Sequence, residues 1–277
     1  MESEDRSGIP ELVGGAPLYR RPEPLNPIDH GNLGLIAPEI PFAFAAGQHF
    51  VPLLYSEFVP ASTSYPVIFA GEEKTPLAVM GLQAGGNLFV PGAVNRGEVY
   101  VPAYLRRYPF VVANASTPGD NAAVICIDRE SPLIGENPTH PFYQDGANTE
   151  YTNNCIKFCQ DYENERMVTL QFVQRLKELD LFDLRSAKYN PPPELGMGSD
   201  PVEVAGYYAI DSEKLNDLPV ETYIQFRDQG LLPAIFAHWA SQTQWDRIVA
   251  RSLRAEFDKA EAGRVQAMAA AAGSPLN

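Results

Sequence analysis

The stretch YPVIFAGEEKTPLAVMGL, residues 65–82, decides the fold class. It contains two short apolar runs, Tyr65–Ala70 and Leu77–Leu82, separated by the turn residues Gly71–Lys74. Apolar runs of this length that are bounded by glycine and proline are typical of buried strands, and a short polar turn between them joins the strands antiparallel. We therefore predict a β-hairpin inside an antiparallel sheet.

The segments around this hairpin extend the predicted sheet. Asn87–Val90 follows it after a glycine turn, and Phe110–Ala113 and Ala123–Ile127 form a further pair of runs. The chain also holds 25 prolines among its 277 residues, and proline breaks helix interiors. We therefore predict that the chain between Phe42 and Asp128 consists mainly of antiparallel strands rather than helices.

The apolar pattern changes in the second half of the chain. Over Thr149–Leu179 apolar residues recur every three or four positions without proline, which predicts one long helix or two consecutive ones. A connector at Ser186–Pro201 precedes a predicted strand at Val202–Ile210, and a capping box of Ser241 and Gln244 is expected to open the last helix. The expected fold class is α+β, with an antiparallel sheet from the N-terminal half packed against C-terminal helices.

Three segments describe the predicted domain organisation. Residues 1–40 form a proline-rich arm, and its leucines and Tyr19 are too apolar for a solvated tail, so we expect the arm to pack on the body. Residues 41–262 form a single α+β domain. Residues 263–277 are expected to be a flexible tail because they are rich in alanine and then turn to glycine, serine and proline.

The overall charge limits the classes of partner. The formal net charge is −14 and the pI is near 4.7, so the chain would repel a phosphate backbone, and nucleic acid is not expected as a partner. No apolar stretch approaches the ~18 residues that a transmembrane helix needs. Three cysteines and no cleavable signal favour the cytoplasm, although export without such a signal, for example through the alanine-rich C-terminal residues, stays open.

The stretch VYVPAYLRRYPF, Val99–Phe110, resembles the hallmark of the bacterial SapC family. Members carry a tryptophan shortly before this block, whereas this chain has Val94-Asn95-Arg96 there. Weaker similarities occur in the same order along the chain, at Val51-Pro52-Leu53, Glu57-Phe58, Tyr65–Phe69, Met80-Gly81-Leu82, Asn87–Val90, Cys126-Ile127-Asp128, Gly206-Tyr207-Tyr208, Asp211, Gly230-Leu231 and His238.

The resemblance implies little about chemistry. The family takes its name from a link to paracrystalline surface layers, and its members often lie near genes for outer-membrane receptors and flavin-dependent tryptophan halogenases. It supplies no catalytic residues that can be assigned to positions in this chain. The expected role is a SapC-like accessory protein that binds a protein or peptide partner, with a link to surface-layer or outer-membrane systems and no cofactor.

The candidate site centres on two adjacent arginines in the family block. Because neighbours in a regular conformation point in different directions, one of Arg106 and Arg107 can be solvated while the other turns inward. Glu57 and Asp128 are the expected partners of the inward guanidinium. An ion pair internal to the protein is the alternative to a binding role. The candidate ligand-binding residues are Arg106, Arg107, Tyr104, Tyr108, Glu57, Asp128 and His238.

A metal-dependent enzyme that modifies peptides or amino acids is the alternative function. It would use His49 and His238 with an acid such as Glu57 or Asp128. Yet the four histidines, which include His30 and His140, show no HExxH, HxD or HxH spacing, so no metal site is predicted. Cys155 and Cys159 share a helix face but lack a second cysteine pair, and Cys126 is expected in the core. Whether the chain catalyses a reaction stays open at this stage.

Overall fold

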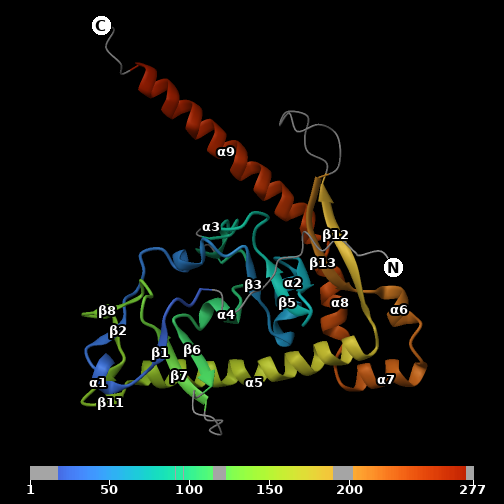
Figure 1. Cartoon of the computed structure of the whole chain (residues 1–277), viewed down its shortest axis with the longest axis horizontal. Helices are drawn as coiled ribbons and strands as arrows, with labels where there is room; N and C mark the ends of the chain where they lie inside the picture. Colours follow the sequence, from blue (N-terminus) through green and yellow to red (C-terminus); the bar gives the residue numbers. More distant parts are fainter. Residues whose placement is uncertain (1–17, 91, 96, 115–122, 190–201, 273–277) are drawn as a thin grey trace.

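The computed structural model describes residues 18–90, 92–95, 97–114, 123–189 and 202–272, and it shows a mixed α+β fold with antiparallel sheets (Figure 1). Within these described ranges the strands form four separate sheets. They are β1 (Pro22–Pro24), β2 (Leu33–Leu35), β3 (Phe50–Pro52), β4 (Val67–Ala70), β5 (Thr75–Val79), β6 (Phe110–Asn114), β7 (Ala123–Asp128), β8 (Ile134–Glu136), β9 (His140–Pro141), β10 (Tyr143–Gln144), β11 (Ala147–Asn148), β12 (Phe182–Tyr189) and β13 (Val202–Ile210).

The helices are short in the first half and long in the second. Two 3-10 turns, η1 (Ala43–Ala45) and η2 (Tyr55–Glu57), accompany them. The helices are α1 (Pro27–His30), α2 (Phe58–Ser62), α3 (Gly92–Asn95), α4 (Ala103–Arg106), α5 (Glu150–Glu178), α6 (Ser212–Asn216), α7 (Val220–Asp228), α8 (Leu232–Ser241) and α9 (Gln244–Ala272).

The predicted hairpin forms the middle of the largest sheet. β4 and β5 pair antiparallel from Val67 opposite Ala78 to Ala70 opposite Thr75, and all four residues of β4 are buried. The sheet has the order β12-β13-β4-β5-β3. The α+β prediction is therefore confirmed, but two of the five strands come from the second half of the chain and not the first.

Asn87–Val90 is not a strand, and the prediction for that segment is wrong. The side-chain oxygen of Asn87 accepts hydrogen bonds from the backbone N–H groups of Phe89 and Val90, which folds the segment into a turn. An asparagine that bonds the backbone two and three residues ahead competes with strand pairing. β3 takes the third place beside the hairpin instead.

Two further predictions in the second half need correction. The predicted connector begins too early, because residues 186–189 belong to β12 and pair with β13. The rest of the predicted connector, residues 190–201, lies outside the described residues. Ser241 does not cap α9 either. Its buried hydroxyl accepts from the N–H of Val67 and donates to the carbonyl of His238, so it joins α8 to β4.

The arm contributes a strand to a second sheet. β1 pairs antiparallel with β7 from Pro22 opposite Asp128 to Pro24 opposite Cys126, and β6 lies on the other side of β7. Residues 1–17 of the arm and residues 273–277 lie outside the described part, whereas α9 continues to Ala272. The described part of the arm also contains α1 and β2, and β2 pairs with β8 and β9 in a separate sheet. The boundaries at 40 and 262 stay predictions.

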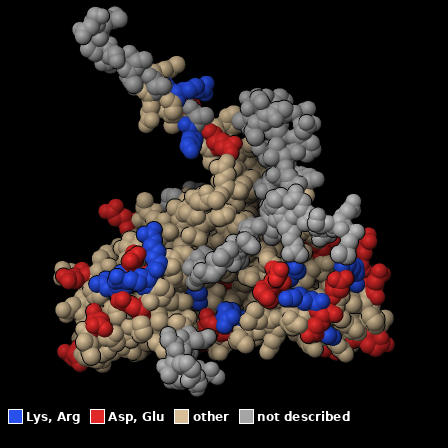
Figure 2. Space-filling model, in the orientation of Figure 1, with Lys and Arg blue, Asp and Glu red and all other residues tan. Residues whose placement is uncertain are grey.

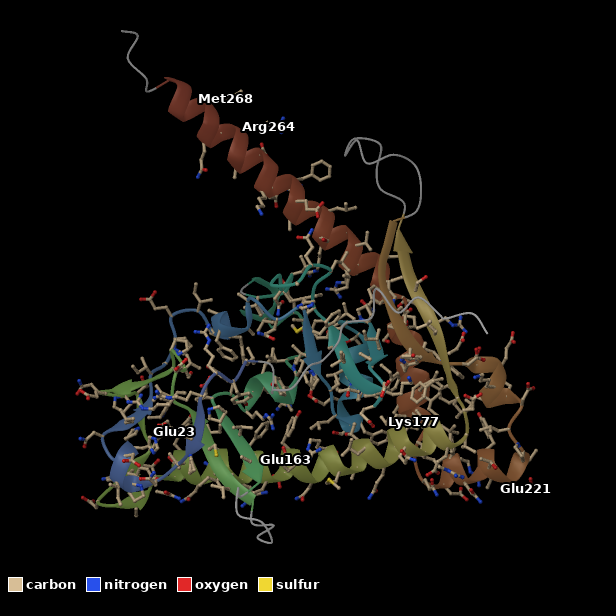
Figure 3. The ribbon with its side chains drawn as sticks, viewed as in Figure 1. Glu23, Glu163, Lys177, Glu221, Arg264 and Met268 are labelled. Carbon is tan, nitrogen blue, oxygen red and sulfur yellow. The ribbon has the colours of Figure 1, made fainter. Side chains whose placement is uncertain are left out.

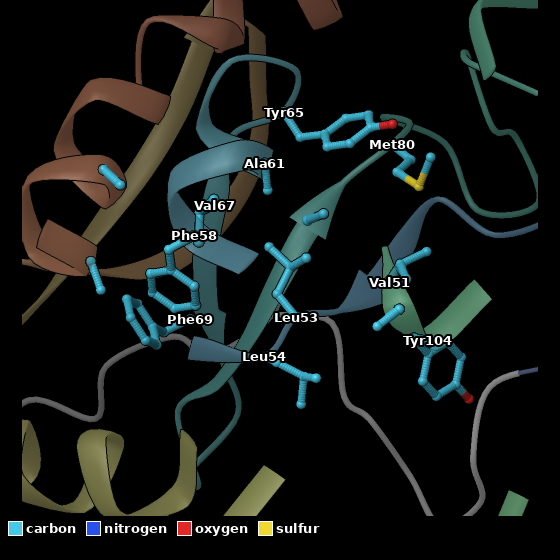
Figure 4. Packing of buried hydrophobic residues seen from close by; sticks show 14 of the residues in the cluster. Val51, Leu53, Leu54, Phe58, Ala61, Tyr65, Val67, Phe69, Met80 and Tyr104 are labelled. Atoms are coloured by element: carbon cyan, nitrogen blue, oxygen red, sulfur yellow. The ribbon is translucent and has the colours of Figure 1, made fainter. Parts of the chain in front are cut away.

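The long helix α5 connects the two sheets. Thr149 caps its first turn by accepting from the N–H of Thr152. The N-terminal part of α5 packs against β6, and the C-terminal part contributes Phe172 and Leu176 to the main core. That core also contains residues of the large sheet and of α2, and Figure 4 shows Phe58 and Phe69 side by side within it.

Candidate functional site

The middle of the block forms a single helical turn, α4, which ends at Arg106 and is followed directly by Arg107. Pro102 has extended backbone and precedes the turn, which begins at Ala103. Consecutive residues of a helix point about 100° apart. The two arginines therefore separate: the side chain of Arg106 is 42% exposed, whereas that of Arg107 is 5% exposed.

Three tyrosine rings surround the buried guanidinium group of Arg107. Its central carbon lies 4.0 Å from the ring centre of Tyr162, 4.8 Å from that of Tyr104 and 5.6 Å from that of Tyr19. These tyrosines come from α5, α4 and the arm. An arginine over an aromatic face at such distances is attracted by the negative face of the ring. Three segments far apart in the sequence thus hold one charge.

The carboxylate nearest to Arg107 is that of Glu163 on α5, labelled in Figure 3. Arg107 donates to it over 3.3 Å, while its other oxygen accepts from the Nε of Arg166 at 2.6 Å. Burial lowers the pKa of Arg107, but interactions with the three tyrosines and Glu163 outweigh burial, so the net pKa is raised and the group stays charged. The Nε–H of Arg107 finds no hydrogen-bond acceptor among the described residues.

Glu57 does not neutralise the inward guanidinium, contrary to the sequence-based expectation. Its carboxylate accepts from the backbone N–H of Ala103 at 2.6 Å, from that of Leu54 at 2.9 Å and from the hydroxyl of Tyr100 at 2.9 Å. Burial raises the pKa of Glu57, although these hydrogen bonds counteract the shift. Because its oxygens are occupied, Glu57 anchors the start of α4, and its contact with Arg106 is longer, at 3.9 Å.

Asp128 is likewise committed to another partner. The fully buried carboxylate accepts from the backbone N–H groups of Arg20 and Arg21, at 3.2 and 2.8 Å, and from the hydroxyl of Tyr108 at 3.0 Å. It therefore fixes the arm and Tyr108 at the end of β7. The expectation that Asp128 pairs with an arginine side chain is wrong, because backbone donors of the arm occupy the carboxylate.

Arg106 lies on the surface above the same region. Its Nε donates to the carbonyl of Val101 at 3.1 Å and one terminal nitrogen donates to the hydroxyl of Tyr100 at 3.2 Å. Its guanidinium carbon lies 5.3 Å from the ring centre of Phe158 on α5. The group is thus oriented by local contacts while a large part of it faces solvent.

A small pocket opens between α4 and α5 where both arginines meet the helix. Its volume is about 180 Å³. Cys155 contributes a thiol whose pKa is raised by burial, so this sulfur is protonated at neutral pH and is a poor nucleophile. The lining residues are Arg106, Arg107, Tyr108, Phe110, Tyr151, Asn154, Cys155 and Phe158.

His238 lies in a different place, beneath β13. Its Nε2 accepts from the backbone N–H of Ile210 at 3.0 Å, which assigns the proton to Nδ1, and burial lowers the pKa of His238 to about 4. It lines a second pocket of about 450 Å³ with Arg185, Trp239 and Gln242 among others. The structure therefore brings Arg106, Arg107 and Tyr108 together in one pocket, with Tyr104 against Arg107, and places His238 elsewhere.

The residues of the alternative enzymatic site do not converge. No group of three histidine, cysteine, aspartate or glutamate side chains within the described ranges is arranged to hold a metal ion. His49 is half-buried against Phe50, and burial lowers its pKa, whereas Glu57 and Asp128 have the separate partners given above.

A family model for SapC matches residues 25–248. The chain belongs to the SapC family. The match begins inside the arm, one residue after β1, and ends within α9, so it includes α4, α5 and the pocket. Searches of curated proteins and of solved structures return no match for this chain. None of the helices described is long and apolar enough to cross a bilayer.

In this SapC chain, half of the pocket lining comes from α5, and the sequence did not indicate these residues as part of the site: Tyr151, Asn154, Cys155 and Phe158. Tyr151, Cys155 and Phe158, together with Tyr162 beside Arg107, follow one another at spacings of three or four on one face of α5. That spacing predicts a buried helix face, but it contains no information that the face lies against α4. Guanidinium groups stay protonated at physiological pH, so the arrangement is suited to binding an anion rather than to transferring a proton.

Proposed function

We propose that this SapC chain is an accessory protein that binds a protein or peptide partner by taking one carboxylate of that partner into the pocket between α4 and α5. The observation that carries the proposal is the unmet Nε–H of buried Arg107 in a pocket that it shares with the exposed Arg106. Buried polar groups are nearly always hydrogen-bonded, so a buried donor without a partner indicates that a bound ligand supplies the acceptor. A carboxylate supplies that acceptor and a compensating charge.

The size of the pocket supports a side chain or a chain terminus as the ligand. Sites for small molecules and cofactors typically have volumes of about 300–1,000 Å³, and this pocket holds about 180 Å³. Its walls include the rings of Phe110, Tyr151 and Phe158. Aromatic walls pack against the methylene groups of a glutamate or aspartate, while the arginines bind its carboxylate.

The charge distribution supports recognition of a single carboxylate over a broadly acidic partner. The chain carries a net charge of −14, which disfavours the approach of a polyanion. On the face shown in Figure 2, acidic and basic side chains lie near one another in several places, with uncharged surface between them. Affinity for the partner then comes from contacts inside the pocket rather than from long-range electrostatic attraction.

A photo-crosslinking experiment in the native cells tests this proposal. Asn154 is exposed and lines the pocket, so a photoreactive amino acid at this position would lie next to the bound ligand. The proposal predicts one covalent adduct, with an aspartate, glutamate or C-terminal carboxylate near the crosslinked position of the partner. Arg106→Ala should abolish the adduct, because it removes the guanidinium that faces solvent.

Arg227→Ala is the matched control, because Arg227 is an exposed arginine on α7 whose ion pair is with its neighbour Asp228. It should leave the adduct intact. The absence of an adduct, or an adduct that persists in Arg106→Ala, would reject the proposal.

The identity of the crosslinked partner also tests two predictions from the sequence. A partner from a surface-layer or outer-membrane system would support the link that the family name implies. The predicted cytoplasmic location requires a separate measurement, in which the chain is followed by antibody through cell fractionation. Recovery mainly with the envelope fraction would contradict that location.

A further inference from the structure

The helix α9 leaves the body of the molecule after its first three turns (Figure 1). Ile248 is fully buried in the main core, and Glu256 accepts a hydrogen bond from the side chain of Gln83. From Phe257 to Met268, every side chain that the structure describes is exposed. The outer part of α9 therefore has no packing partner among the described residues.

One face of this outer part has the pattern of a helix-pairing seam. Phe257, Glu261, Arg264 and Met268 follow one another at spacings of four, three and four residues, which places them along a single stripe. Phe257 is 42% exposed and Met268 is 73% exposed. Figure 3 shows Arg264 and Met268 on this projecting segment. Large apolar side chains at regular spacing on a solvated helix indicate a surface that another element covers.

We propose that this stripe pairs antiparallel with the same stripe of a second copy of the chain. In an antiparallel pair related by a two-fold axis, Phe257 lies opposite Met268 of the partner subunit, and Glu261 lies opposite Arg264 of the partner subunit. The axis repeats both contacts, so the four residues make two apolar and two oppositely charged contacts. A two-fold interface must be complementary to itself in this way.

The charges also decide the direction of the helices. In a parallel pair each residue would face its own copy, so Glu261 would meet Glu261 of the partner subunit and Arg264 would meet Arg264 of the partner subunit. Like charges in register are unfavourable. Neither Glu261 nor Arg264 forms an ion pair with another described residue, so both are available for the partner subunit. The stripe is short, which predicts a weak dimer whose population depends on concentration.

Sedimentation velocity of the full chain over a wide concentration range tests the pairing. The wild type is expected to shift from monomer to dimer, and high salt should weaken the dimer. Glu261→Arg and Arg264→Glu each place like charges opposite one another, so each variant alone should dimerise about 100-fold more weakly. A mixture of the two variants should form a heterodimer, because the opposite charges then face each other.

Lys259→Glu is the matched control, since Lys259 is exposed on the opposite side of α9 and the substitution makes the same change in charge as Arg264→Glu. It should dimerise as the wild type does, and circular dichroism should show equal helix content in all variants. A chain that stays monomeric throughout would overturn the proposal and would assign the stripe to another partner. A dimer that both substitutions leave unchanged, or variants that do not associate when mixed, would also overturn it.

Discussion

At the scale of single residues, Arg107 shows how a buried charge is kept by aromatic rings together with one carboxylate, that of Glu163. Each cation–π contact contributes about 0.5–2 kcal/mol, depending on how far it is desolvated, and three tyrosine rings lie around the group. Arg107 also donates to Glu163 at 3.3 Å, and the other oxygen of that carboxylate accepts from Arg166. Arg107 is therefore held in place and charged, while its Nε–H has no acceptor among the described residues.

His238 yields a prediction about pH at the same scale. Burial lowers its pKa from 6.5 to about 4, so the unfolded chain binds a proton below about pH 6.5 that the folded chain does not bind until about pH 4. The contribution of His238 to stability is thus present above pH 6.5 and is lost as the pH falls. Between pH 6.5 and pH 4 the unfolding free energy falls by about 1.4 kcal/mol per pH unit, so the total loss approaches about 3 kcal/mol near pH 4.

Urea unfolding of the wild type and of His238→Gln at about pH 7 and about pH 4.5 measures this contribution. The glutamine retains an oxygen that can accept from the N–H of Ile210 but does not titrate, so the unfolding free energy of this variant should fall less with decreasing pH. The exposed His140→Gln is the control and should follow the wild type. Equal pH dependence of His238→Gln and wild type would show that the buried imidazole does not cause the effect.

The sequence predicted the orientation of Arg106 and Arg107 correctly because local backbone geometry determines it. Two adjacent arginines in a helical turn must point apart, and one of them does turn inward. The partners of the inward group were not predictable in the same way. Glu57 and Asp128 have the right charge, but backbone N–H groups of α4 and the arm use their oxygens, and Glu163 comes from a helix whose placement the sequence does not give.

At the scale of secondary-structure elements, Asp128 holds β1 on the second sheet. It binds the arm through the backbone N–H groups of Arg20 and Arg21, beside the pairing of β1 with β7. Asp128→Ala removes these acceptors and that of Tyr108, and a buried donor without a partner costs about 1–3 kcal/mol. We expect the unfolding free energy to fall by about 3 kcal/mol.

Hydrogen exchange measured by mass spectrometry locates the effect of Asp128→Ala. Protection should decrease first in β1 and β7, because the arm is released from the sheet, while the hairpin of β4 and β5 keeps its protection. Glu130→Ala, an exposed acid two residues away, is the control and should change neither stability nor exchange. Unchanged exchange in β1 would contradict the role given to Asp128.

Helices and strands were predictable where the apolar pattern of their own residues was strong. They were missed where contacts with residues remote in the sequence determine the structure. The three- and four-residue spacing of apolar residues in α5 and the continuous apolar runs of the hairpin are local signals, and both elements form as expected. The turn at Asn87 follows from a side chain that bonds its own backbone. β12 continues past Ser186 because β13 lies beside it, and strand pairing of this kind depends on a partner remote in the sequence.

At the scale of the whole molecule, α5 determines where the pocket lies. It has 29 residues and extends over about 43 Å at 1.5 Å per residue, which is enough to connect the second sheet to the main core. The pocket lies between this helix and α4, beside the arm that Asp128 fixes. The proposed binding site therefore depends on the arm, α4 and α5 together, and we propose that their junction accepts a carboxylate.

Arginine side-chain NMR of the intact chain tests whether this junction binds a carboxylate. We expect the Nε–H signals of Arg106 and Arg107 to shift saturably when N-acetylglutamate α-amide is added, since its side-chain carboxylate would enter the pocket. The uncharged N-acetylglutaminamide has nearly the same shape and should leave both signals in place. If the Arg107 signal does not move with the carboxylate, or moves equally with the uncharged amide, the pocket is not a carboxylate site.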